Sequence, residues 1–259
     1  METNAAGGTY LYSVVPKSVA PRLEHLRGIE QGEVYTIESG ELAAVVSDVP
    51  NREKLRPERR LVAAHQEVIR RAADASPGVL PFSFGTVAED PDGVRELLQR
   101  YGPDLADQMR HVEGKVQMGV RLSYSASAPS VFDFLVANSS ELREARDRMA
   151  TGGREATREE KIDLGQLVDA VLGRLRDEYA RRIEQALGAV AESKRNPPRR
   201  EKEFVNGAFL VPKYRLAEFD AAVESLAGLF PDSFTVEVVG PFPPYDFVDL
   251  HVTSLPPAH

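Results

Sequence analysis

Few side chains in this sequence have the types and spacing that catalysis or metal binding requires. Cysteine is absent, which removes thiolate ligands, cysteine nucleophiles and disulfides. No Gly-x-x-x-x-Gly-Lys-Ser/Thr string occurs and no Gly-x-Gly-x-x-Gly follows a strand, so neither common phosphate-binding loop is visible. The histidines are scattered and lack the i, i+4 spacing of a zinc-binding helix: His25, His65, His111, His251 and His259. We therefore expect no catalytic, cofactor or metal site, and no enzyme.

Two histidines leave alternatives open. His65 falls on the apolar face of an expected helix, where a neutral imidazole needs a hydrogen-bond partner. A satisfied core histidine is favoured over a ligand or a general base, because the sequence identifies no partner residue. Near the end of the chain, Asp246, Asp249 and His251 could touch a metal, but solvated charges on a Pro-bounded tail are the favoured interpretation.

A basic group surrounds two prolines: Lys194, Arg195, Arg199, Arg200 and Lys202. It could bind an acidic partner or nucleic acid, but no aromatic residues alternate with it as stacking platforms, so a solvated loop is favoured. The net charge of −8 also opposes a duplex-wide grip on phosphates. Most of the negative excess lies after Phe204, which suits solubility or a basic partner.

Composition is that of an ordinary folded protein. With 259 residues, 42% of them hydrophobic and 28% charged, the chain favours two domains over one and excludes wholesale disorder. No basic segment precedes a long apolar core at the start, and no run approaches the roughly 20 apolar residues of a membrane span. A soluble, intracellular protein without nucleic-acid or membrane partners is expected.

The first half predicts strands, a tight hairpin and helices. Residues 9–16 read as a strand, and residues 33–38 and 41–49 as a hairpin turning at Ser39-Gly40. A helix after Pro57 carries one apolar stripe and stops at Ser76-Pro77-Gly78: Leu61, His65, Val68, Ile69 and Ala72. Residues 79–87 predict a buried strand interrupted by Pro81 and Gly85, and Asp90-Pro91 begins a short helix.

The second half predicts strand, long helix, strand, helix and strand. Strands are expected at residues 115–124, 204–211 and 234–239, the last ended by Gly240 and Pro241, with helices over residues 163–191 and 216–229. Thr157 and Glu160 have capping-box spacing, whereas the charged residues 141–160 predict a mobile connection. This order favours a ferredoxin-like α/β plait. The predicted fold is α+β, with an N-terminal α/β domain over residues 1–112, a ferredoxin-like domain over residues 113–240 and a Pro-rich tail over residues 241–259.

Two strings are unusual enough to suggest a family. The first, residues 80–87, reads Leu-Pro-Phe-Ser-Phe-Gly-Thr-Val; the second, residues 240–248, reads Gly-Pro-Phe-Pro-Pro-Tyr-Asp-Phe-Val and follows the apolar run 204–211. In this order the chain resembles the gas vesicle GvpL/GvpF family from Tyr10 to Val248. It departs from the family pattern at Phe242, where tryptophan is usual, and at Ser83, where arginine is usual. Phe242 keeps an aromatic group, while Ser83 loses any ion pair of that guanidinium.

The resemblance implies a fold and a role. Family members have an N-terminal domain, a modified ferredoxin-like domain and a C-terminal tail, and are minor structural or assembly components of the gas vesicle. The role usually proposed is binding the shell protein GvpA, with other gas vesicle accessory proteins as further candidate partners, and preventing its aggregation during nucleation. Gas vesicle and cytoplasm would be the locations. The alternative is a ferredoxin-like small-ligand-binding protein or enzyme with a site near His65.

Candidate contact residues follow from this role. Aromatic side chains concentrate binding energy at interfaces, so Tyr12, Phe82 and Phe84 are candidate docking residues of the first domain, although for each residue taken alone a core position is the favoured interpretation. In the tail, Phe242, Tyr245 and Phe247 are expected to pin an extended, proline-stiffened segment onto the protein's own surface.

Overall fold

The computed structural model describes residues 7–23, 26–50, 55–151 and 157–249. The chain divides into two compact units, and each is built from several segments. The first combines Met1–Met118, Leu210–Lys213 and Gly240–His259; the second combines Gly119–Phe209 and Tyr214–Val239. Helices and strands occur in both units, which confirms the expected α+β class.

The first unit contains an antiparallel sheet built on β1 (Gly8–Pro16). The strand order is β2-β3-β1-β4, where β2 is Val34–Ser39 and β3 is Leu42–Val49. The predicted hairpin is confirmed: Ser39 pairs with Leu42, and Gly40 turns the chain with a φ of 59°, a conformation that glycine adopts without strain. β1 is buried along its length because it lies between neighbouring strands and under helices.

Residues 79–87 form two short strands in place of one interrupted strand. β4 (Leu80–Pro81) and β5 (Val87–Ala88) both pair antiparallel with β1, and residues 82–86 loop out between them. We call residues 82–86 the motif loop. Gly85 has a φ of 89°, in the region that side-chain-bearing residues avoid, so the chain can turn out of the sheet edge and return to it. The sequence predicted one strand interrupted at Pro81 and Gly85; the structure instead has a five-residue loop between two separate strands.

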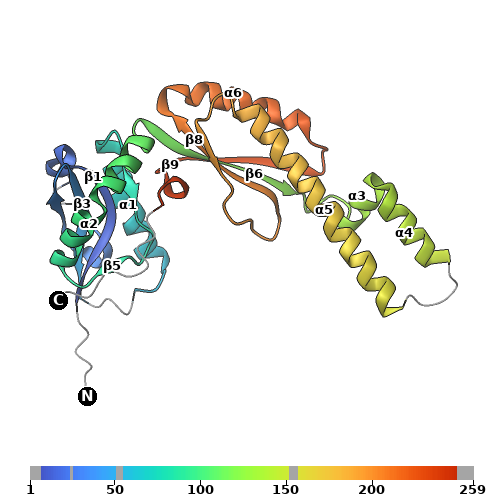
Figure 1. Cartoon of the computed structure of the whole chain (residues 1–259), viewed down its shortest axis with the longest axis horizontal. Coiled ribbons are helices and arrows are strands. Elements are labelled where there is room, and N and C mark those ends of the chain that lie inside the picture. Colours follow the sequence, from blue (N-terminus) through green and yellow to red (C-terminus); the bar gives the residue numbers. More distant parts are fainter. Residues whose placement is uncertain (1–6, 24–25, 51–54, 152–156, 250–259) are drawn as a thin grey trace, which may run out of the picture. The chain divides into compact units, whose positions relative to one another are not determined.

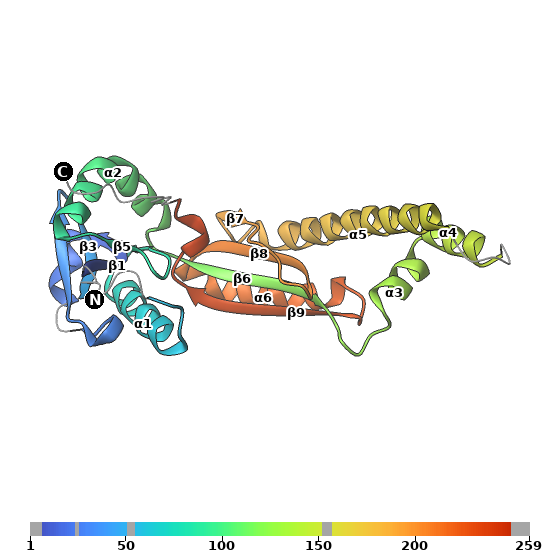
Figure 2. The ribbon, with the colours of Figure 1, turned by 90° about the horizontal axis from the view of Figure 1, so that it is seen from below.

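Two helices cover opposite faces of this sheet (Figure 2). The first, α1 (Arg59–Ala75), ends before Ser76 and buries the predicted stripe: Leu61, His65, Val68, Ile69 and Ala72. The second, α2 (Pro91–Val112), is 22 residues long, so the expectation of a short helix was wrong. Asp90 caps it by accepting a hydrogen bond from Gly93 N at 2.8 Å.

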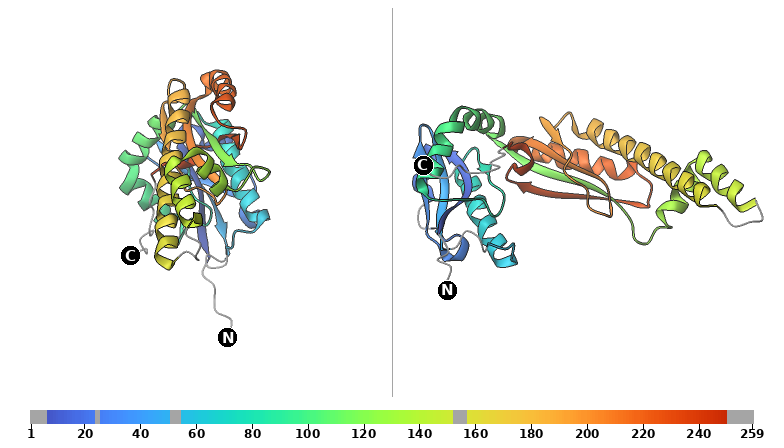
Figure 3. Two further views of the ribbon diagram at one scale, coloured as in Figure 1. Left: turned by 90° about the vertical axis from the view of Figure 1, so that its right-hand side faces the viewer. Right: turned by 60° about the horizontal axis from the view of Figure 1, so that its bottom comes forward.

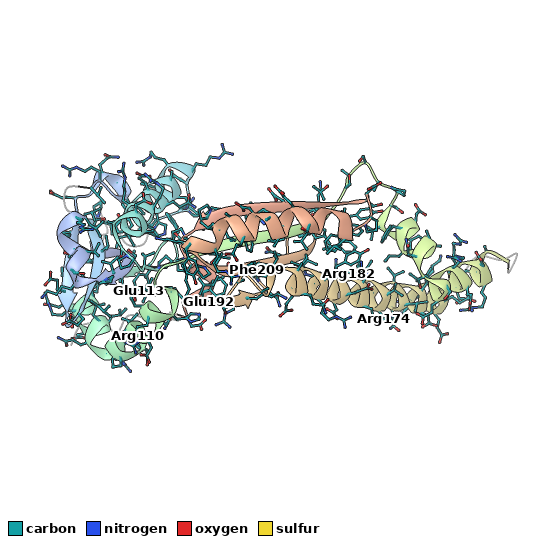
Figure 4. All side chains as sticks on the ribbon, turned by 90° about the horizontal axis from the view of Figure 1, so that it is seen from above. Arg110, Glu113, Arg174, Arg182, Glu192 and Phe209 are labelled. Atoms are coloured by element: carbon teal, nitrogen blue, oxygen red, sulfur yellow. The ribbon has the colours of Figure 1, made fainter. Side chains whose placement is uncertain are left out.

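A second, four-stranded sheet has the strand order β7-β8-β6-β9. Its strands are β7 (Ser193–Arg195), β8 (Glu203–Pro212), β6 (Lys115–Tyr124) and β9 (Phe234–Phe242). The C-terminal part of α5 (Arg158–Leu187) and the whole of α6 (Leu216–Leu226) cover one face of this sheet (Figure 1). Phe209 of β8, labelled in Figure 4, packs against Phe219 of α6 with ring centroids 6.0 Å apart. The strand ending expected at Gly240 was wrong, because β9 continues to Phe242.

Residues 131–138 and 140–151 are helical, which corrects the mobile connection expected over residues 141–160 for the part that the structure describes; residues 152–156 lie outside it. α3 (Val131–Asn138) and α4 (Ser140–Thr151) lie beside the N-terminal half of α5 (Figure 3). Leu135, Val136 and Leu142 are buried there against apolar residues of α5. The charged residues of α4 occupy its exposed face, so one buried leucine suffices to pack this helix.

The long helix begins earlier than its apolar stripe suggests. The predicted capping box of Thr157 and Glu160 is confirmed, and it places the helix start at Arg158, five residues before the expected start. Short 3-10 helices occur in both units: Lys17–Arg22, Ile29–Gln31, Lys213–Arg215, Ala227–Leu229 and Tyr245–Phe247.

Candidate functional site

The centre of the first unit is a hydrogen-bonded pair, Tyr10 of β1 and His65 of α1. The Tyr10 hydroxyl lies 3.0 Å from His65 Nδ1, and Gly85 N of the motif loop donates to the same hydroxyl at 2.9 Å. Because this oxygen accepts from Gly85, its proton is available for His65 Nδ1. A hydrogen bond to the Phe82 backbone raises the pKa of His65, so the imidazole is the donor in it; because Nδ1 faces the Tyr10 hydroxyl, we assign the proton to Nε2. This tautomer of His65 provides hydrogen-bond partners for the Tyr10 hydroxyl and for the Phe82 backbone at the same time.

Burial holds His65 in its neutral form. Desolvation lowers the pKa of His65 to about 4, although the backbone hydrogen bond to Phe82 acts in the opposite sense. Burial likewise raises the pKa of Tyr10, against the lowering effect of the Gly85 hydrogen bond. The pair is therefore uncharged at neutral pH and has the character of a satisfied core contact.

The three predicted docking residues surround this pair at different depths. Tyr12 is buried and accepts a hydrogen bond from Ile29 N at 2.8 Å, with Ser47 Oγ 2.7 Å from its hydroxyl. Phe82 is also buried. Phe84 is only partly buried, and its ring centroid lies 5.7 Å from that of His65. The motif loop thus exposes part of Phe84, while direct partner contact by Tyr12 and Phe82 stays a prediction.

Two further backbone hydrogen bonds attach the motif loop to β1. Phe82 N donates to Tyr12 O at 2.9 Å, and Leu11 N donates to Thr86 O at 2.9 Å. Together with the Gly85 bond, they fix both ends and the tip of the loop on one strand. A loop held in this way loses little conformational entropy when a partner binds it.

The second unusual string enters the same core. Tyr245 packs against it, and burial raises the pKa of Tyr245 to about 12. Phe247 is buried as well, whereas Phe242 is 45% exposed, so the expectation that Phe242 pins the tail was wrong. Tyr10 and Tyr245 are close enough to interact electrostatically. Two strings far apart in the sequence therefore meet around one aromatic cluster.

A side chain that the sequence did not single out holds this string. Gln117 of β6 donates from Nε2 to Asp246 Oδ2 at 2.5 Å and accepts from Asp246 N at 2.8 Å. Asp249 N donates to Gln108 Oε1 at 2.8 Å. Gln117 is distinguished by being a buried polar residue within β6. Its burial cannot be read from the sequence, so the sequence did not identify it.

No metal centre is evident in the described part of the chain. Among those residues, no three or more histidines and carboxylates are placed together so as to hold a metal ion. Asp246 is hydrogen-bonded to Gln117, and His251 lies outside the described residues. Across the same ranges, no helix has both the length and the apolarity needed to cross a bilayer.

Comparison with known proteins gives this cluster a family context. The family model described as "Gas vesicle synthesis protein GvpL/GvpF" matches residues 8–249, a range that contains the whole aromatic cluster. The chain belongs to the GvpL/GvpF family. The resemblance inferred from the two strings is thereby confirmed. Both strings lie inside the matched range, and both contribute to one folded unit of this GvpL/GvpF family member.

Relatives of this GvpL/GvpF chain cover almost its entire length. Gas vesicle protein F of Streptomyces sp. (strain CB03234) is 34% identical over 245 residues, covering 93% of this chain and 99% of the relative. Gas vesicle protein F of Haloferax mediterranei is 24% identical over 246 residues, covering 94% of each. The crystal structure of GvpF from Anabaena sp. PCC7120 matches with a TM-score of 0.78 at 24% identity, over 94% of this chain and 99% of that one. The fold is therefore shared with a solved GvpF.

Proposed function

We propose that this chain takes part in gas vesicle synthesis by binding the shell protein GvpA and preventing its aggregation during nucleation, without making or breaking a covalent bond. Membership of the GvpL/GvpF family over residues 8–249 is the observation that carries this proposal. The physical reasoning is that a shell subunit with an apolar face aggregates in water unless another protein covers that face. A chain with a net charge of −8 would keep such a complex dispersed.

The proposed docking surface is the motif loop with Phe84 at its centre. Phe84 is partly exposed and rests on His65, so an apolar partner could bury the rest of its ring without a rearrangement of the core. Tyr12 and Phe82 would then act from beneath, by holding the loop in position. The N-terminal domain over residues 1–112 would dock the partner, with residues 113–240 and the tail 241–259 as further parts of the proposed organisation.

Gas vesicle and cytoplasm are the proposed locations, and other gas vesicle accessory proteins are further candidate partners. Both proposals are supported by the family and by the relatives, which are named as gas vesicle proteins. Neighbouring genes offer an inexpensive check, since genes for small apolar shell proteins beside this one would support the assignment.

Co-purification with GvpA tests the proposal. The full-length chain should capture GvpA, and Phe84→Ala should reduce capture at least about fivefold, because a truncated anchor residue typically costs more than 1 kcal/mol. Tyr214→Ala is the matched control, since Tyr214 is 83% exposed and lies in the second unit. Melting curves of both variants would show that they are folded.

Three results would count against the proposal. Failure of the unmodified chain to capture GvpA would overturn binding itself. Loss of capture in Tyr214→Ala but not in Phe84→Ala would overturn the docking surface. Normal gas vesicles in a host lacking this gene would overturn the role in synthesis.

A further inference from the structure

A hollow of about 470 Å³ lies in the second unit, between α5 and the chain that leads into β8. Its volume falls within the range of about 300 to 1,000 Å³ that is usual for ligand sites. Arg176 and Asp177 line it from α5, Asn196 and Arg199 from the loop, and Phe204 from β8. All of these residues belong to one compact unit.

Arg176 is the unusual residue of this hollow. Its Nε is buried and has no hydrogen-bond acceptor among the residues that the structure describes. Its guanidinium carbon lies 5.4 Å from the ring centroid of Phe204, which provides an aromatic face for the cation. A buried Nε–H donor without an acceptor is costly, even where the rest of the guanidinium group is only partly buried.

Two neighbouring arginines of α5 form hydrogen bonds with other residues of the protein. Arg174 and Arg182 are labelled in Figure 4; Arg174 bonds Glu141 at 2.7 Å, and Arg182 bonds Glu178 and also Leu229 O, the latter at 3.1 Å. Arg176 differs because burial and the like charge of Arg199 both lower its pKa, and the weaker opposing effect of Asp169 does not cancel them. Both effects disfavour the charged guanidinium of Arg176. A negative charge placed in the hollow would stabilise that charged form.

Arg199 is the member of the basic loop that lines the hollow. It is held in place by donating from Nη1 to Phe204 O at 3.3 Å. Lys194 instead forms an ion pair with Glu184, with Nζ 2.9 Å from Oε2, and Arg200 Nε lies 3.9 Å from Glu203 Oε1. Of the basic residues grouped in the sequence, Arg199 therefore lines the hollow, whereas Lys194 and Arg200 lie outside its lining.

We propose that the hollow binds the carboxylate of an acidic peptide segment, with Arg176 and Arg199 as its hydrogen-bond donors. Guanidinium groups present paired donors that match the two oxygens of a carboxylate. The lining carries two positive charges, Arg176 and Arg199, and one negative charge, Asp177, so it favours a monoanion over a phosphate dianion. The volume accommodates a side chain together with its flanking backbone. This inference does not depend on GvpA.

Calorimetric titration of the full-length chain with a capped tetraglutamate peptide at low ionic strength tests the site. Arg176→Gln and Arg199→Gln should each weaken binding at least about tenfold, as expected for loss of a hydrogen bond to a charged group. Arg200→Gln is the matched control, because it removes the same charge from the same loop outside the lining, and its affinity should stay within about twofold. Arg176→Lys should weaken binding by an intermediate factor, because the charge remains while the planar fork is lost.

Several outcomes would overturn the proposal. Equal weakening in all three glutamine variants would show diffuse attraction by the basic loop, and no heat with the unmodified chain would show that the peptide does not bind. Inorganic phosphate binding more tightly than the peptide would contradict the carboxylate assignment. Arg199 is exposed, so Arg199→Gln keeps the test decisive if Arg176→Gln does not fold.

Discussion

Tyr10 and His65 share one hydrogen bond, 3.0 Å between the hydroxyl oxygen and Nδ1, at the point where the motif loop closes over the first unit. The same hydroxyl accepts from Gly85 N. One oxygen atom therefore connects a central strand, the helix above it and the tip of the loop. The family string that contains Gly85 has a structural explanation here, because its backbone supplies the donor that completes the Tyr10 hydrogen bonds.

Removal of this hydroxyl should destabilise the protein. In Tyr10→Phe, His65 Nδ1 and Gly85 N both lose a buried partner, so the free energy of unfolding should fall by about 1 to 3 kcal/mol. Urea denaturation would measure the loss. Tyr35→Phe is the control, because its hydroxyl bonds Asp48 at 2.8 Å near the surface and water can replace it. A loss in Tyr10→Phe no larger than in Tyr35→Phe would contradict this account.

Stability should depend on pH through His65. Its pKa is about 6.5 when unfolded and about 4 when folded, so between these values the unfolded state binds more protons. The free energy of unfolding should therefore decrease as the pH falls from about 6.5 to about 4, by up to about 3 kcal/mol from this group. Urea melts at several pH values would show the slope.

His65→Gln isolates this contribution. Carboxylates such as Glu67, whose pKa is lowered to about 2 by hydrogen bonds to Arg70 and Arg71, also titrate as the pH falls, but they are present in both proteins. The slope in the unmodified chain should exceed that of His65→Gln between pH 6.5 and 4. Identical slopes would mean that His65 does not titrate as a buried group.

The sequence predicts most elements here but few of their contacts. Periodicity gave the buried stripe of α1 and the hairpin, because both depend on neighbouring residues. The bonds of Gln117 to Asp246 and of Tyr10 to His65 join positions far apart in the chain, and no local pattern encodes them. For residues 141–151 the expected mobile connection was wrong, because charge on the exposed face of α4 concealed the buried Leu142.

Phe247 should contribute more to stability than Phe242 does. Phe247→Ala removes a buried aromatic ring and should lower the free energy of unfolding by about 3 to 5 kcal/mol. Phe242→Ala makes the same chemical change at an exposed position and should cost less than about 1 kcal/mol. Thermal and urea melts of both variants would decide. Equal effects would contradict the burial difference between the two rings.

Leu142 should hold α3 and α4 against the long helix. The leucine is fully buried in a small cluster with Leu135 and Val136, so Leu142→Ala should weaken that cluster by about 2 to 5 kcal/mol, while the rest of the second unit keeps its own core. Amide hydrogen exchange should speed up across residues 131–151 and leave β8 protected. Ile162→Ala is the control, since Ile162 of α5 is 48% exposed and should leave exchange unchanged. Rapid exchange of α4 already in the unmodified chain would show that this helix is not packed by Leu142.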